Sequence, residues 1–239
     1  MEEFILNRPF ARHGLAGSLH PPEPDLAWSC PLAPRPGPAE RRPDCYPFRR
    51  GTVSVEHSQS TPHFRLHPPG PSTAGRPVFL TWRLRESVPH DRLVHSASQS
   101  PWEEFAWLDR FLDEARTGPL YFRHGEVAGM VVETFRAYGP ALQQYELHSF
   151  VVMPNHVHLL LTPRIELAKL TAFVKGAIAR RANELLNQPD TPFWDEENCE
   201  HLVGDTHELG RIRQYIELNP VPVGMAREPA DYVYSSAAR

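Results

Sequence analysis

A short apolar segment with two histidines constrains this 239-residue chain more than any other feature. It reads Val-Val-Met-Pro-Asn-His-Val-His-Leu-Leu-Leu over residues 151–161. Two β-forming runs on either side of the Met-Pro-Asn break predict a pair of antiparallel strands, 145–153 and 156–162. Side chains two residues apart on a strand point to the same face. His156 and His158 should therefore share one face, with Val157 packed behind them.

Two imidazoles on one strand face can bind a metal ion or a phosphate; the alternative is a pair of partly buried structural histidines. Two protein ligands leave an ion unsaturated, so a third must come from elsewhere. A helix over 207–219 offers one, because Tyr215 and Asn219 are four residues apart and share a helical face. Taken alone, each residue has a common structural explanation. A tyrosine on an amphipathic helix such as Tyr215 usually packs in the core, and an asparagine before a proline, such as Asn219 before Pro220, commonly ends a helix.

Proline content divides the chain into two parts. Many of the 26 prolines lie in the first third, which predicts a proline-rich, disordered leader over residues 1–75. A folded domain over 76–239 follows. It should contain a strand at 78–84, a helix from Pro101 and further helices at 126–138, 166–186 and 207–219, with Phe193 and Trp194 in a loop. Helices interleaved with hairpin-like strands predict an α+β domain with an antiparallel sheet.

Composition excludes several classes of protein. Three widely spaced cysteines provide neither a disulfide framework nor a Cys-x-x-Cys ligand pair, which favours a reducing cytoplasm. No apolar run reaches the roughly 18 residues that a membrane-spanning helix needs. The net charge of −4 argues against a protein that coats nucleic acid non-specifically, although it leaves room for a local basic face.

Three motifs, taken in order, resemble the REP-associated tyrosine transposases. These belong to the IS200-like single-tyrosine transposases of the HUH endonuclease superfamily. The motifs are Met-Pro-Asn-His-Val-His at 153–158, Tyr-Ile-Glu-Leu-Asn-Pro-Val at 215–221 and Tyr-Ser-Ser at 234–236. The strand at 79–84 and the Phe-Trp pair at 193–194 also resemble family features in the matching order.

The resemblance implies a ferredoxin-like antiparallel sheet with helices packed on it. It also implies that His156 and His158 bind Mg²⁺ or Mn²⁺, that Asn219 is a further metal ligand and that Tyr215 is the catalytic nucleophile. Members of this family cleave and rejoin single-stranded DNA near hairpins through a 5′-phosphotyrosine intermediate. The expected partner is therefore single-stranded or hairpin DNA with REP-like palindromes, and the protein is expected to act as a monomer or a homodimer.

Residue types also suggest DNA contacts. Lys175, Arg180 and Arg181 on the helix 166–186 can follow a phosphate backbone, and Trp194 can stack on an unpaired base. The alternatives are a solvated helix face and a core tryptophan. The acidic run at 195–200 is unfavourable in a loop that contacts DNA, because its charges repel phosphates.

Two other functions remain open from the sequence. One is a non-catalytic DNA-hairpin-binding protein derived from a decayed or domesticated transposase. The other is a metal-dependent hydrolase or RNA-processing enzyme in which water, rather than Tyr215, attacks the phosphate.

Overall fold

The described part of the chain lies almost entirely within the range 76–239 that is predicted to be a folded domain. The structure, a computed structural model, describes residues 73–89 and 101–238, all within the unit Pro31–Arg239. The predicted disordered leader, 1–75, lies outside the described residues except for its last three positions. The fold is therefore built from β1 onward.

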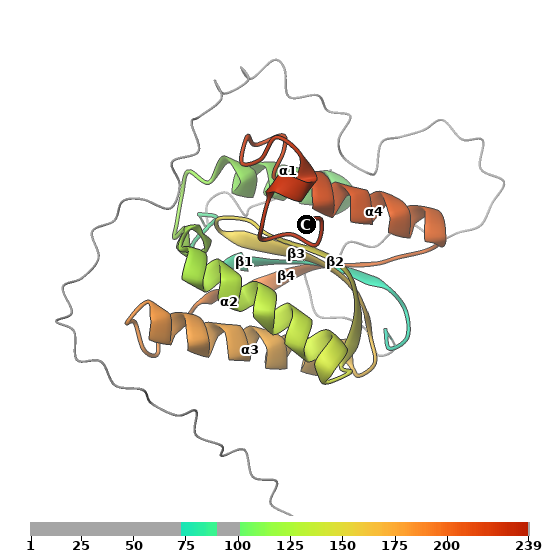
Figure 1. The fold of residues 1–239 in the computed structure, drawn as a ribbon, viewed down its shortest axis with the longest axis horizontal. Coiled ribbons are helices and arrows are strands. Elements are labelled where there is room, and N and C mark those ends of the chain that lie inside the picture. Colours follow the sequence, from blue (N-terminus) through green and yellow to red (C-terminus); the bar gives the residue numbers. More distant parts are fainter. Residues whose placement is uncertain (1–72, 90–100, 239) are drawn as a thin grey trace, which may run out of the picture. The chain divides into compact units, whose positions relative to one another are not determined.

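Within the described residues, four strands form one antiparallel sheet in the order β2-β3-β1-β4 (Figure 1). The strands are β1 (Val78–Leu84), β2 (Tyr145–Val152), β3 (His156–Pro163) and β4 (Trp194–Leu202). β2 and β3 form the predicted hairpin, and β1 pairs with both β3 and β4. This order confirms the predicted ferredoxin-like sheet.

The prediction of a loop at Trp194 is wrong, because Trp194 is the first residue of β4. β4 pairs with β1 from Val78 to Trp82 and, after an irregularity, at Leu84. Its acidic residues suggested a loop, but two of them have a buried partner on β1. The Arg83 guanidinium lies 2.9 Å from Asp195 Oδ1 and 3.1 Å from Glu197 Oε2.

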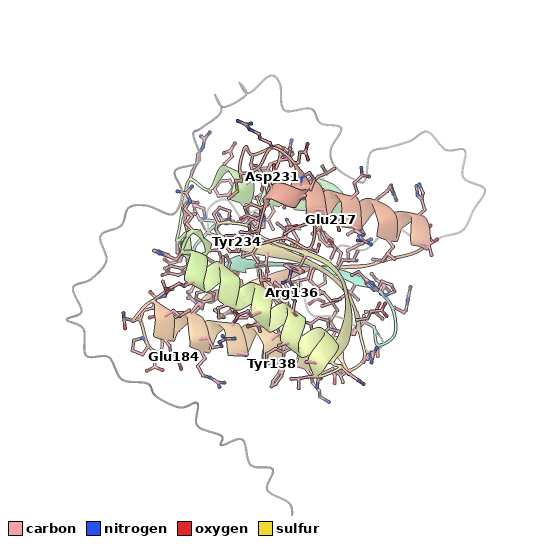
Figure 2. The ribbon with its side chains drawn as sticks, viewed as in Figure 1. Arg136, Tyr138, Glu184, Glu217, Asp231 and Tyr234 are labelled. Carbon is pink, nitrogen blue, oxygen red and sulfur yellow. The ribbon has the colours of Figure 1, made fainter. Side chains whose placement is uncertain are left out.

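Helices cover both faces of the sheet (Figure 1). α2 (Gly125–Arg136) and α3 (Leu167–Leu185) lie on one face, and α1 (Pro101–Glu114) and α4 (Thr206–Leu218) lie on the other. Figure 2 shows Tyr138, just after α2, and Glu217, on α4, on opposite sides of the sheet. Three short elements complete the described chain: η3 (Tyr121–Arg123), the π-helical turn η4 (Ala137–Ala141) and η5 (Pro229–Asp231). No helix in this part of the chain is long and apolar enough to cross a membrane.

Strand alternation divides the buried side chains into two clusters. Trp82 on β1 and Val157 on β3 belong to the cluster that α2 and α3 cover. Phe79 and Leu160, which have the opposite parity on the same strands, belong to the cluster on the α1/α4 side. The two-residue period of each strand therefore decides which helix layer a side chain meets.

Phe135 of α2 provides a test of the first cluster. Its ring is 0% exposed and lies 6.2 Å from the Trp82 ring and 5.8 Å from the Phe150 ring, between centroids. We expect Phe135→Ala to lower the free energy of unfolding by about 3–5 kcal/mol, because it removes a buried aromatic ring and leaves a cavity. Phe173→Ala is the matched control: Phe173 is 52% exposed, and the expected loss is about 1 kcal/mol or less. Urea unfolding followed by tryptophan fluorescence measures both, and equal losses would contradict the assignment of this core.

Candidate active site

β3 places His156 and His158 on the α1/α4 face of the sheet, as their spacing predicted. Both side chains are 0% exposed, and their ring centroids are 4.8 Å apart. Val157 between them packs into the opposite cluster. The shared face of the two histidines is thus confirmed.

Both imidazoles are oriented through Nδ1. Asn155 Oδ1 lies 2.8 Å from His156 Nδ1, and the Thr81 hydroxyl lies 2.8 Å from His158 Nδ1. The Asn155 amide also donates a hydrogen bond to the Leu112 carbonyl at 3.1 Å, so its oxygen faces His156 as an acceptor. His156 therefore carries its hydrogen on Nδ1, which leaves Nε2 with a free lone pair.

The two Nε2 atoms have the character of metal ligands. Both atoms are buried; His156 Nε2 has no hydrogen-bond partner among the described residues, and His158 Nε2 faces a carboxylate oxygen 3.0 Å away. Burial, and then the nearby His158, lower the pKa of His156 to about 3, so this imidazole is neutral at pH 7. A neutral imidazole held by a hydrogen bond at its other nitrogen is the form that binds a metal.

Asp109 on α1 joins the histidines, and the sequence analysis missed it. The side chain is 1% exposed, and Oδ1 lies 3.0 Å from His158 Nε2. One ligand atom from each of Asp109, His156 and His158 lies within 4.8 Å of the others. Burial acts to raise the pKa of Asp109, but interactions with His158, His156 and Tyr215 outweigh it and lower the pKa. The buried carboxylate is therefore ionised at neutral pH.

The sequence did contain a signal for Asp109. Phe105, Leu108 and Leu112 of α1 are buried, and Asp109 is four residues after the first and three before the last. A carboxylate at this position lies on the apolar face of the helix, where it needs a buried partner. One turn later, Asp113 Oδ1 lies 3.9 Å from His156 Nε2. α1 thus presents two carboxylates to the two histidines.

α4 brings Tyr215 to the same place. Ile212, Tyr215 and Ile216 are the buried residues of α4, and they bind the helix to the cluster on this face. The Tyr215 hydroxyl donates a hydrogen bond to Asp109 Oδ2. Its ring centroid is 5.7 Å from that of His158. The structure therefore brings together the predicted nucleophile and the predicted metal-binding pair.

Asn219 lies one turn after Tyr215, at the C-terminal cap of α4. Its side chain is buried, and its Oδ1 has no hydrogen-bond partner within the described part of the chain. The position suits a ligand, and the role of Asn219 as one stays a prediction.

The basic residues predicted to contact DNA lie on the other side of the sheet. Lys175, Arg180 and Arg181 belong to α3, whereas the histidines and Tyr215 lie under α1 and α4. Arg180 and Arg181 are exposed, and Arg181 lies 3.6 Å from the Glu133 carboxylate. A DNA strand would have to pass an edge of the sheet to reach both groups. Their DNA-binding role stays a prediction.

Lys175 and Trp194 have structural contacts. The Lys175 ammonium donates hydrogen bonds to the Asp195 carbonyl at 2.9 Å and to Asn198 Oδ1 at 2.8 Å. Burial lowers the pKa of Lys175 to about 8. The Trp194 ring is 8% exposed, and its indole N–H donates a hydrogen bond to the Lys175 carbonyl at 3.0 Å. These contacts favour the core-packing alternative for Trp194 over base stacking.

Comparison with known proteins finds one family model that matches part of the domain. The family model described as "Transposase IS200 like" matches residues 124–219, a range that includes both histidines, Tyr215 and Asn219. Over these residues the chain is similar to the IS200-like transposases. The chain is also similar to a solved structure described as "Structure of the REP associates tyrosine transposase bound to a REP hairpin". That match has 16% identity and a TM-score of 0.41, and it covers 75% of this chain and 82% of the other. No curated protein matches the sequence.

Experiment can distinguish the structural role of Lys175 on α3 from a DNA-binding role of Arg180 on the same helix. We expect Lys175→Ala to lower the free energy of unfolding by about 1–3 kcal/mol, because it leaves buried hydrogen-bond acceptors unpaired. Arg180→Ala should leave stability unchanged and reduce the slope of log affinity for a single-stranded oligonucleotide against log salt by about 0.7. Arg116→Ala, at a side chain 73% exposed near the end of α1, is the charge-matched control. An unchanged salt slope in Arg180→Ala would remove this residue from the DNA contacts.

Proposed function

We propose that this protein is a metal-dependent transposase that cleaves and rejoins single-stranded DNA near hairpins through a 5′-phosphotyrosine intermediate. The observation that carries the proposal is the convergence of Tyr215 with His156 and His158 in a domain that matches the IS200-like family. The three residues come from two elements that are distant in sequence, β3 and α4, yet they share one buried site.

Tyr215 supplies the nucleophile. Its oxygen attacks the scissile phosphorus, the bond from phosphorus to the 3′ oxygen breaks, and the 5′ phosphate remains on the tyrosine. The phenol loses a proton and the 3′ oxygen gains one. Because the pKa of a free tyrosine is about 10, only about one molecule in a thousand is ionised at pH 7. The nucleophile therefore needs a neighbouring acceptor, and its hydroxyl already donates a hydrogen bond to Asp109.

Rejoining is the reverse of this step. A 3′ hydroxyl attacks the phosphotyrosine, and the tyrosine oxygen leaves with the proton that the hydroxyl gives up. No ATP is required, because the covalent intermediate conserves the energy of the phosphodiester bond.

The site residues fit a divalent cation, for which we propose Mg²⁺ or Mn²⁺. His156 and His158 would bind it through Nε2, and Asn219 through its side-chain oxygen. His156 Nε2 and Asn219 Oδ1 are buried without a hydrogen-bond partner among the described residues. When bound, the cation would polarise the scissile phosphate and stabilise charge on the leaving oxygen. The protein's part is to hold the histidines through Asn155 and Thr81 and to exclude water from the site.

For the substrate, we propose single-stranded or hairpin DNA with REP-like palindromes, as the sequence motifs imply. Arg180 and Arg181 are exposed on α3, and Arg181 also lies 3.6 Å from the Glu133 carboxylate, so Arg180 is the better placed of the two to contact a phosphate backbone. A chromosomal DNA substrate agrees with the cytoplasmic location that the cysteine content favours, and either a monomer or a homodimer can carry the proposed site.

The decisive test replaces the nucleophile. Tyr215→Phe should abolish the denaturant-resistant adduct between the protein and a 3′-labelled hairpin oligonucleotide, because phenylalanine has no oxygen to bond to phosphorus. Tyr232→Phe is the matched control: this buried tyrosine lies on the same side of the sheet, but its hydroxyl donates to the Val152 carbonyl. It should retain the adduct.

Each other outcome of this assay has a definite meaning. An adduct in Tyr215→Phe would show that the nucleophile is another residue. Metal-dependent cleavage without any adduct would identify a hydrolase, and hairpin binding without cleavage would identify a non-catalytic binding protein.

The histidine pair provides a second prediction. His158→Ala should reduce the rate of adduct formation by at least about a hundredfold, since it removes a proposed ligand of the cation. His148→Ala is the control: His148 lies on β2, and its Nε2 contacts the Thr162 hydroxyl at 2.8 Å. Addition of a chelator should stop the wild-type reaction, and Mn²⁺ should restore it. Full activity in the presence of a chelator would exclude metal dependence.

A further inference from the structure

We propose that Asp109 has two roles in this site. Its Oδ1 is an additional protein ligand of the cation, and its Oδ2 positions the Tyr215 hydroxyl beside that cation. The inference rests on the proposed function and adds to it a residue on α1, which lies outside the range that matches the transposase family.

The geometry of the cluster supports the first role. An ion bound at about 2.1 Å has neighbouring ligand atoms about 3.0 Å apart and opposite ligand atoms about 4.2 Å apart in an octahedral arrangement. Asp109 Oδ1 and His158 Nε2 are 3.0 Å apart, as two neighbouring ligands of one ion would be. All three ligand atoms lie within 4.8 Å of one another, so a contraction of about 0.6 Å brings the widest pair to the octahedral limit.

Burial and hydrogen bonding also support a bound cation. A buried carboxylate is unfavourable unless hydrogen bonds and an opposite charge compensate it. Asp109 Oδ2 accepts the Tyr215 hydrogen bond, and Oδ1 lies 3.0 Å from His158 Nε2. His156 Nε2 is buried and has no hydrogen-bond partner among the described residues. A single cation would satisfy all three atoms, because imidazole nitrogens and a carboxylate oxygen are ordinary metal ligands.

The second role follows from the separate use of the two carboxylate oxygens. An ionised carboxylate accepts bonds at both oxygens, so coordination through Oδ1 leaves the hydrogen bond at Oδ2 intact. The Tyr215 oxygen is then held one carboxylate group away from the ion. A phosphate bound to the same ion would meet the nucleophile at short range, which is the requirement for in-line attack.

Asp113 provides a close comparison within the same helix. It lies one turn after Asp109, but its nearest distance to His156 Nε2 is 3.9 Å and it is outside the group of ligand atoms that approach one another. Both residues are aspartates on the α1 face that opposes β3. A difference between their variants therefore reports the position of the carboxylate rather than a general loss of negative charge.

The test measures Mn²⁺ binding to the full chain by electron paramagnetic resonance, with no DNA present. We expect Asp109→Asn to weaken Mn²⁺ binding by at least about tenfold, as loss of a charged ligand should. Asp113→Asn should stay within about threefold of the wild type, a smaller change than loss of a ligand or its support produces. Wild-type affinity in Asp109→Asn would overturn the ligand role.

Folding of the variant is checked by thermal unfolding with and without Mn²⁺. Asp109→Asn should unfold cooperatively without the metal, because asparagine has nearly the same shape and adds no buried charge. Added Mn²⁺ should raise the midpoint of the wild type by more than that of the variant, because the variant binds the ion more weakly. An equal rise in both proteins would overturn the ligand role by a second route.

The positioning role has a spectroscopic readout. The ultraviolet absorption of Tyr215 is obtained as the difference between the wild type and Tyr215→Phe. In an Asp109→Asn background the same difference should shift to shorter wavelength, because the charged acceptor of the phenol hydrogen bond is lost. An unchanged difference spectrum would overturn this role.

These readouts are independent of DNA cleavage. If Mn²⁺ binding requires Asp109 but the wild type forms no adduct, the proposed function fails and the inference stands. If the adduct forms and Asp109→Asn binds Mn²⁺ normally, the inference fails and the proposed function stands.

Discussion

The buried carboxylate of Asp109 is the interaction on which the arrangement of the α1/α4 face depends. It comes from α1 and contacts His158 of β3 and Tyr215 of α4, so it joins three elements at one point. Apolar packing around Phe79 and Phe105 holds these elements together but is non-directional. The Asp109 carboxylate fixes the orientation of the side chains around it, because a buried ionised carboxylate needs hydrogen-bond donors or a cation at its oxygens. The orientations of His158 and Tyr215 are therefore coupled.

Much of the fold could be predicted because single elements carry periodic patterns. The β2–β3 hairpin and the helices follow from apolar residues at strand or helix spacing, and the structure contains each of them. β4 could not be predicted in this way. Its sequence contains Asp195 and Glu197, whose charges are compatible with a strand only because Arg83 on β1 lies against them. A cross-strand partner more than a hundred residues away is not visible in local periodicity.

Local sequence patterns likewise predict some residues of the candidate site and not others. The shared face of His156 and His158 follows from a spacing of two residues on one strand. Tyr215 does not follow from spacing, since a buried tyrosine on an amphipathic helix usually packs; its proposed role came from the family resemblance. Asp109 does not follow from helical periodicity, because the apolar positions of α1 predict which face is buried but not which partner a charged residue on that face meets. Only the packing of α1 against β3 shows that the partner is His158.

The acidic run after Trp194 also has a different meaning in the folded protein. As a loop, residues 195–200 would place negative charge near DNA and would favour a decayed element that binds its substrate poorly. As a strand, the run places Asp195 and Glu197 against the Arg83 guanidinium. Glu200 is buried, and burial raises its pKa to about 7, so this side chain carries less negative charge at neutral pH than an exposed glutamate. Three of the acidic residues thus serve the packing of the strand or lose charge through burial, and the run argues less strongly against DNA binding than the same residues would in a loop.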